Sequence, residues 1–252
     1  MVAQLGLKMF EDAFKGYEDQ YVLIGGSATQ LAMEESGQQF SRTTKDLDIV
    51  VIVDALTPEF IERFWQFVKE GKYQTQQKSN TTKQFYRFKK PETPEYPIML
   101  ELFSRMPDFL RERDIGELRA IPLAEDVSSL SAILLDDDYY NLIKNNRKDG
   151  VIWVDATALI PLKAKAWLDL SARKRVGEKI DSADIRKHLR DVLRLISTLP
   201  TDYKYTLPSS IAQDMQQFLD QAKGESVDPS GLNYPKGVTL ADVLNQVGRA
   251  FL

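Results

Sequence analysis

The apolar residues at the start of the chain follow a helical spacing and then form a continuous run. An amphipathic helix is predicted from the apolar positions Leu7, Phe10, Phe14 and Tyr17. Residues 21–26, YVLIGG, are apolar and end in two glycines, so we expect a buried strand there. Residues 27–36, SATQLAMEES, have a helix-forming composition and predict a second helix that stops at Gly37.

The rest of the N-terminal half continues this alternation of strands and helices. Residues 46–53, DLDIVVIV, are rich in β-branched residues and predict a central strand, and residues 85–88 and 98–103 are further candidates. Thr57 as N-cap and Pro58 at the first helical position predict a helix. The apolar stripe of that helix consists of Phe60, Ile61, Phe64, Trp65 and Val68. We expect an α+β fold, α/β-like in character, with a mixed sheet flanked by helices.

The C-terminal half has a mainly helical pattern. The predicted elements are strands at 131–135 (SAILL) and 151–154 (VIWV), and helices at 162–175, 182–197, 209–222 and after Thr239. Residues 223–237 have the composition of an exposed loop. The change in periodicity predicts two domains, a mixed domain over residues 1–155 and a helical domain over residues 156–252.

Composition narrows the possible locations and chemistries. No stretch approaches the roughly 20 apolar residues that span a bilayer, and the N-terminus lacks a leader pattern, so we expect a cytoplasmic protein without a membrane partner. The chain has no cysteine, and His188 is its single histidine. Disulfides and thiolate metal sites are therefore excluded, and histidine-based zinc chemistry is disfavoured. A metal ion would be bound mainly by oxygen atoms.

Positive charge is concentrated in two segments, although the net charge is −4. Residues 72–90 contain six Lys and Arg and no acid, and residues 163–194 contain ten Lys and Arg against five acids. Such segments can be a solvated surface or a site for phosphate groups. The sequence leaves both interpretations open.

Two aspartates begin the predicted central strand. Side chains two residues apart on a strand share a face, so Asp46 and Asp48 lie together with Val50 and Ile52. Adjacent carboxylates in a partly dry environment repel each other and are costly without a partner. A divalent cation removes this conflict, and Mg²⁺ binds carboxylates together with water and phosphate oxygens.

A third acid and a glycine turn extend this pattern. Glu101 interrupts the apolar strand 98–103, which favours a functional role, although an edge strand with one wet face would also explain it. Gly25, Gly26 and Ser27 precede a helix, where the free amides and the helix dipole favour a phosphate. A tight turn between strand and helix is the alternative. Together, these elements predict adjacent sites for metal and triphosphate.

These motifs resemble a known superfamily. GGSATQLA, then RTTKDLD from Arg42 to Asp48, then Glu101, resemble the DNA polymerase β-like nucleotidyltransferases. More narrowly, the chain resembles the AbiEii/AbiGii toxin family of type IV toxin–antitoxin systems. The resemblance implies a nucleotidyltransferase sheet followed by a helical C-terminal domain. It also implies possible toxicity and an antitoxin protein encoded nearby.

The resemblance selects residues in the C-terminal half as well. LIPLKAKAWLDLSAR matches the lysine helix of the family and selects Lys163 with Ala166. The later Lys-Asp-hydrophobic-x-Asp motif reads here as residues 183–187, so Asp184 is kept and Lys187 replaces the second aspartate. Helical spacing places Asp184, Lys187, His188 and Asp191 on one face. That face is either part of the site or an exposed salt-bridged surface, and His188 is expected to be a surface residue.

The resemblance and the residue pattern together predict a reaction. An NTP would transfer its nucleoside monophosphate to a hydroxyl of RNA, such as a tRNA 3′ end, or of a protein. Asp46 and Asp48 would bind two Mg²⁺ ions, and Glu101 would complete the metal site or accept the proton. Lys163 would neutralise phosphate charge, and Arg42 would contact substrate or brace the metal-binding strand.

Three alternatives stay open at the level of sequence. The chain could bind nucleotides or partners without catalysis, or it could be a phosphotransferase with the same metal geometry. Asp136, Asp137 and Asp138 form a rival acidic cluster after a predicted strand. The cluster lacks a preceding glycine–serine turn, so we interpret it as a polar exit from the strand.

Overall fold

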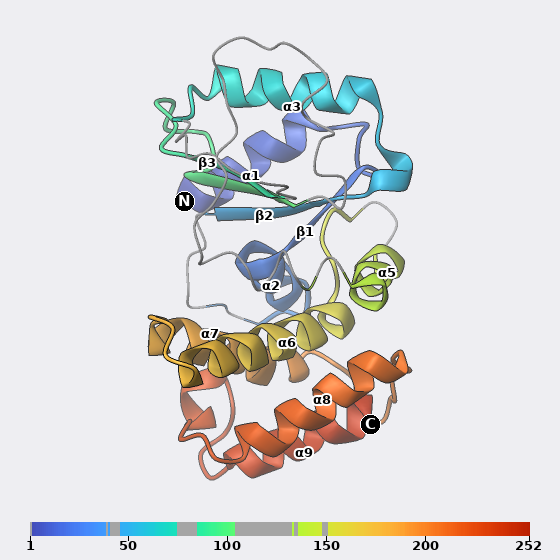
Figure 1. The fold of residues 1–252 in the computed structure, drawn as a ribbon, viewed down its shortest axis with the longest axis vertical. Coiled ribbons are helices and arrows are strands. Elements are labelled where there is room, and N and C mark those ends of the chain that lie inside the picture. The colour runs from blue at the N-terminus through green and yellow to red at the C-terminus, as the bar shows by residue number, and fades with distance from the viewer. Residues whose placement is uncertain are drawn as a thin grey trace.

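The computed structural model of the chain describes residues 2–38, 40, 46–74, 85–103, 133, 136–147 and 151–252. Its fold is α+β, as predicted (Figure 1). Four strands form a mixed sheet in the order β1-β2-β4-β3, namely β1 (Tyr21–Ile24), β2 (Asp46–Val51), β3 (Phe85–Lys89) and β4 (Met99–Phe103). β2 and β4 are parallel, and the two outer pairs are antiparallel.

The helices in the described part of the chain surround this sheet. Their bounds are α1 (Val2–Ala13), α2 (Gly25–Glu35), α3 (Pro58–Glu70), α5 (Asp137–Asn145), α6 (Ala156–Arg175), α7 (Ser182–Ile196), α8 (Ser209–Ala222) and α9 (Leu240–Phe251), with short 3-10 turns at Val53–Ala55 and Pro229–Leu232. None of these helices combines the length and the apolar character that crossing a bilayer requires.

Helices α1 and α3 cover one face of the sheet (Figure 1), and buried aromatic side chains make this face apolar. Thr57 caps α3 by accepting a hydrogen bond from the Phe60 amide, and the predicted apolar stripe of this helix is confirmed. Phe88 of β3 packs against Phe64 and Trp65 of α3, with ring centroids 5.7 and 5.8 Å apart. Aromatic burial therefore closes this face, and the opposite face is left for polar groups.

Helices α2, α6 and α7 lie on the opposite face of the sheet, and α8 and α9 pack beyond them (Figure 1). α6 begins at Ala156, where Asp155 caps it, rather than at the predicted residue 162. Pro161 lies inside this helix and removes one backbone hydrogen bond. Complete burial of this first part of α6, for example at Leu159, offsets that cost.

Several sequence predictions are corrected by the structure. α2 begins at Gly25, so the two glycines start the helix instead of ending the strand. Residues 151–154 form isolated bridges, such as that between Trp153 and Leu23, and not a strand. The predicted strand 131–135 lies mostly outside the described residues. The loop 223–237 is not wholly exposed, because its 3-10 turn buries Pro229 and Leu232.

Candidate functional site

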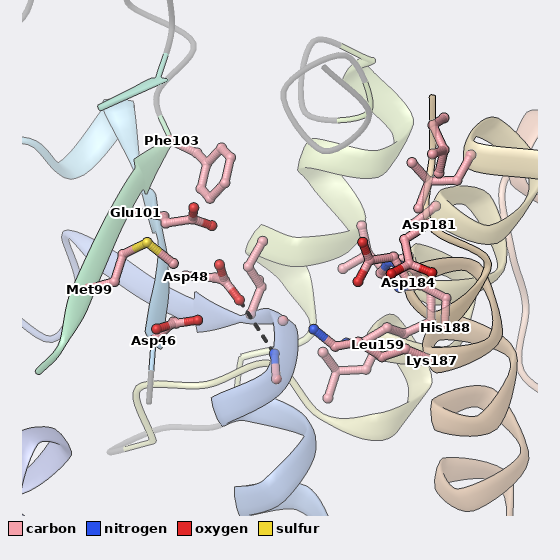
Figure 2. Close-up of a pocket in the computed structure, with 18 of the residues that line it drawn as sticks. Asp46, Asp48, Met99, Glu101, Phe103, Leu159, Asp181, Asp184, Lys187 and His188 are labelled. Atoms are coloured by element: carbon pink, nitrogen blue, oxygen red, sulfur yellow. Dashed lines mark hydrogen bonds between the residues drawn. The ribbon is translucent and has the colours of Figure 1, made fainter. Parts of the chain in front are cut away.

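One row of side chains crosses the polar face of the sheet. Ile24 of β1 pairs in register with Asp48 of β2, Asp48 pairs with Glu101 of β4, and Glu101 pairs with Arg87 of β3. Register partners point to the same face, so these four side chains form one continuous row. Asp46 lies two residues before Asp48, and its carboxylate points the same way (Figure 2). The strands therefore place the three predicted carboxylates on one face of the sheet, with Asp48 and Glu101 directly adjacent.

Burial and mutual repulsion dominate the electrostatics of this row. Glu101 is 9% exposed, whereas Asp46 and Asp48 are half-buried. Burial, followed by the nearby charge of Asp48, raises the pKa of Glu101 to about 8. Arg87 opposes this rise, because its Nε lies 2.5 Å from Glu101 Oε1. Two adjacent carboxylates and one arginine therefore occupy the centre of the sheet.

The start of α2 lies directly against this row. The Gly26 amide donates to Asp48 Oδ2 over 3.4 Å, the contact that is dashed in Figure 2. Gly25 has φ +68°, and a Cβ at this position would lie 1.7 Å from Asp48 Oδ2. Glycine is therefore required both by the left-handed backbone and by the close approach of the carboxylate.

Ser27 has a different environment from the two glycines. Its hydroxyl is buried and donates to the Asp46 carbonyl over 2.6 Å, which joins α2 to β2. Gly25 and Gly26 line the cavity described below, but Ser27 is not among the described residues that do. Ser27 thus has a structural role through its hydroxyl, and the phosphate contact that we predicted for it stays a prediction.

A cavity of about 610 Å³ separates the polar face of the sheet from α6 and α7. Figure 2 shows Asp46, Asp48 and Glu101 on one side, and Asp184, Lys187 and His188 on the other. The cationic residues that line the cavity are Arg87, Lys163, Arg173, Lys179 and Lys187. A polyanion between the two walls would thus face mostly cations on the helical side, which also carries Asp181 and Asp184, and mostly carboxylates on the sheet side, which also carries Arg87.

Lys163 combines a place in the cavity wall with a buried ion pair. Its Nζ lies 3.0 Å from Asp191 Oδ2, and the two side chains are 5% and 0% exposed. Asp191 also lies 3.7 Å from Arg194. The interpretation of this helix face as an exposed surface is wrong for Asp191, because α6 packs over it.

His188 and the neighbouring residues of α7 lie at the cavity. His188 was predicted to be a surface residue, but it is half-buried and lines the cavity with Asp184 and Lys187. The reason is that the side of α7 that carries these three residues borders the cavity, although Asp184 and Lys187 are also exposed to solvent. The structure therefore brings Asp184 and Lys187 to the predicted carboxylates from a segment more than 80 residues away in sequence.

Four charged residues of the cavity wall become apparent only in the structure, namely Arg87, Arg173, Lys179 and Asp181. Arg87 and Phe88 are consecutive in a strand, so a period-two pattern would have placed Arg87 on the polar face. Arg173 and Lys179 were included only as members of a basic segment. Nothing in their sequence context distinguishes them from the other cations of that segment.

The two remaining predicted features have different outcomes. Arg42 is outside the described residues, so its role stays a prediction. In the rival acidic cluster, Asp136 caps α5 and its carboxylate accepts from the Asp138 and Tyr139 amides. Asp138 accepts from Ser210 of α8. These acids stabilise the start of a helix and its packing, and the interpretation of the segment as a polar strand exit is wrong.

The carboxylate row fits a divalent cation in part. Asp48 and Glu101 are adjacent, buried to different degrees and of like charge, and this arrangement of oxygen ligands is stabilised by Mg²⁺. Among the described residues, however, no three acidic or histidine side chains are close enough together to form a ready-made metal site. Glu101 is instead bonded to Arg87.

Comparison with known proteins adds no family assignment. Neither protein-family models nor curated proteins give a match to this chain. The resemblance to nucleotidyltransferases therefore rests on the motifs alone and stays a prediction.

Proposed function

We propose that this protein is a nucleotidyltransferase that moves a nucleoside monophosphate from an NTP to an acceptor hydroxyl with the help of Mg²⁺. The observation that carries the proposal is the meeting of Asp48 and Glu101 with the start of α2 at one cavity. Metal binding needs carboxylates and triphosphate binding needs cations, and the two kinds of group must lie close together. The sheet and the facing helices supply that pairing.

The sheet side of the cavity is suited to the reacting phosphorus. Asp46, Asp48 and Glu101 are the residues that would bind Mg²⁺. When bound, Mg²⁺ supplies neutralisation of phosphate charge and a lower pKa for the attacking hydroxyl. The Gly26 amide, at the positive end of α2, adds a hydrogen-bond donor beside these carboxylates.

The helical side of the cavity is suited to the leaving group. Arg173, Lys179 and Lys187 line this wall and can neutralise the two phosphates that leave as pyrophosphate. Lys163 lines the same wall, and its charge is shared with Asp191. Because phosphoryl transfer depends mainly on positioning and charge, this arrangement would supply most of the catalysis.

The proposed reaction balances as a single displacement. The acceptor oxygen bonds to the α-phosphorus, the bond from that phosphorus to the bridging oxygen of the β-phosphate breaks, and pyrophosphate leaves. The hydroxyl proton goes to a carboxylate. Glu101 suits this role, because burial and Asp48 raise its pKa to about 8.

A labelling assay tests the proposal. The protein is incubated with each α-³²P-labelled NTP and total cellular RNA, with Mg²⁺ or with EDTA, and labelled RNA, labelled protein and pyrophosphate are measured. We expect one acceptor to become labelled, with one pyrophosphate released per transfer and no labelling in EDTA. Absence of labelling on every acceptor, with nucleotide binding intact, would contradict the proposal.

A non-catalytic nucleotide-binding protein is the second candidate. The ion pairs Arg87–Glu101 and Lys163–Asp191 favour it, because each pairs a predicted functional group with a protein partner. NTP binding without pyrophosphate release would support this candidate. Release of orthophosphate or a nucleoside diphosphate would instead indicate a phosphotransferase.

A toxin role is a further part of the proposal, and it rests on the resemblance alone. Growth arrest on expression, relieved by the Asp48→Asn substitution and by the product of a neighbouring gene, would support both the toxicity and an antitoxin partner. Normal growth on expression of the active protein would contradict the toxin role and leave the transferase proposal intact.

A further inference from the structure

A second hollow borders α6 and α7 beside the cavity. This groove, defined by Trp167, Ser171, Lys174, Arg175, Ser182, Ile185, Arg186, Gln221 and Glu225, has a volume of about 590 Å³. Its cations are Lys174, Arg175 and Arg186, which are all exposed, and its single acid is Glu225. The groove therefore carries a positive charge in a protein whose net charge is −4.

The groove and the cavity lie on different sides of the same two helices. Lys174 lines the groove and its neighbour Arg173 lines the cavity. Likewise, Arg186 lines the groove and its neighbour Lys187 lines the cavity. Consecutive residues of a helix point about 100° apart, so the helix bodies separate the two hollows. The exposed connection at residues 176–179 leads from one to the other.

A buried aromatic side chain contributes to the lining of the groove. Trp167 lines the groove and is 2% exposed. Ser171 and Ser182 add hydroxyl groups to the same lining.

The cations of the groove are available to a ligand to different degrees. Arg186 forms no ion pair or hydrogen bond with the described residues. Arg175 donates to the Ser171 carbonyl over 3.3 Å and to Gln221 Oε1 over 3.2 Å, which are neutral acceptors. Lys174 donates to Ser182 Oγ. A phosphate would be a stronger acceptor for each of these groups.

We propose that this groove binds the phosphate backbone of an acceptor RNA, which passes over the α6–α7 connection to present its terminal hydroxyl at the cavity. The inference rests on the proposed function for the identity of the acceptor. Three cations and two hydroxyls against one acid match a phosphodiester chain rather than a protein segment, whose backbone is neutral.

A binding experiment without turnover tests this inference. A 5′-labelled RNA oligonucleotide with a free 3′ hydroxyl is titrated with the full chain carrying Asp48→Asn, in EDTA and without NTP, and fluorescence anisotropy is measured at several salt concentrations. Arg186→Gln and Arg175→Gln are added singly and together. Lys236→Gln is the matched control, because Lys236 is an exposed cation that lines neither hollow.

The expected result is a loss of affinity confined to the groove variants. Each lost phosphate contact should lower the affinity about 3- to 10-fold near physiological salt, and the slope of log K against log salt should decrease by about 0.7 per contact. The control should bind like the parent protein. The indole N–H resonance of Trp167, assigned with Trp167→Phe, should shift when RNA is added.

Other outcomes would overturn the inference. Equal loss in the groove variants and in Lys236→Gln, or an unmoved Trp167 resonance at saturating RNA, would exclude specific binding in the groove. Binding of polyglutamate with the same dependence on Arg186 would exclude RNA as the preferred partner. Because no step requires catalysis, failure of nucleotide transfer leaves this result unaffected, and failure here leaves the transfer assay unaffected.

Discussion

Asp48 and Glu101 are register partners on the parallel strands β2 and β4, and Arg87 contacts Glu101 from the other side. The row therefore has two carboxylates and one guanidinium at the most buried part of the polar face. The repulsion between the two carboxylates destabilises the folded protein, and a bound cation would make the arrangement favourable. The following predictions depend on this charge imbalance and on the packing around it.

Asp48→Asn should abolish Mg²⁺-dependent nucleotide transfer while the protein stays folded. The amide keeps the shape of the side chain but removes a metal-binding charge, so a loss of roughly 100-fold or more is expected. Asp54→Asn is the control, because Asp54 is an exposed aspartate paired with Lys144 away from the cavity. The measurement compares the labelling rates and the circular dichroism spectra of both variants. Undiminished labelling in Asp48→Asn would reject the metal assignment.

Stability should depend on pH through Glu101. Its pKa is raised from 4.5 to about 8 on folding, so the folded state keeps the proton up to a higher pH than the unfolded state does. The tighter binding of this proton stabilises the folded state. This stabilisation is fully present below pH 4.5 and is lost as pH rises towards 8. Urea unfolding in EDTA should therefore show a fall in stability over this range that is smaller in Glu101→Gln.

Magnesium should reverse that loss, because it binds the deprotonated carboxylates. The rise in melting temperature on addition of Mg²⁺ should be larger at pH 8 than at pH 5, and absent in Asp48→Asn. A Mg²⁺ effect that is independent of pH would show that the ion acts elsewhere.

Gly25→Ala should be more damaging than Gly37→Ala. The two glycines have nearly the same φ, +68° and +71°, but a Cβ at Gly25 meets Asp48 Oδ2 at 1.7 Å and one at Gly37 meets nothing within 4 Å. Gly37→Ala should cost about 1–2 kcal/mol from backbone strain alone. Gly25→Ala should cost more and should also displace Asp48, with loss of the Mg²⁺ response. Equal melting temperatures and equal Mg²⁺ responses in the two variants would contradict the close approach.

A double variant that also replaces Asp191, the buried partner of Lys163, can separate the structural role of Lys163 from its functional role. Lys163→Met removes the cation that lies 3.0 Å from the buried Asp191 carboxylate, which should cost about 3–5 kcal/mol. The double variant Lys163→Met, Asp191→Leu should recover most of that stability, because an apolar pair replaces the ion pair. If Lys163 also contacts phosphate, calorimetry should still show weakened NTP binding in the double variant. Binding as tight as in the parent would assign Lys163 a structural role alone.

The sequence by itself determined most of the elements and one wall of the site. Thr57 and Pro58 start a helix through local hydrogen bonds and a fixed φ, and the alternation in β2 places Asp46 and Asp48 on one face whatever surrounds them. Glu101 was found because one charge in an apolar strand stands out. These features depend on neighbours a few residues away, which the sequence displays directly.

Only the tertiary structure decided which groups meet across the cavity. The register of β3 with β4 pairs Arg87 with Glu101, and the packing of α6 on α7 buries Asp191 against Lys163. We predicted His188 to be a surface residue, but the packing of α7 places it in the wall of the cavity. The sequence did not place these contacts because the approach of distant segments depends on the burial of whole helix faces, and many residues contribute to that burial.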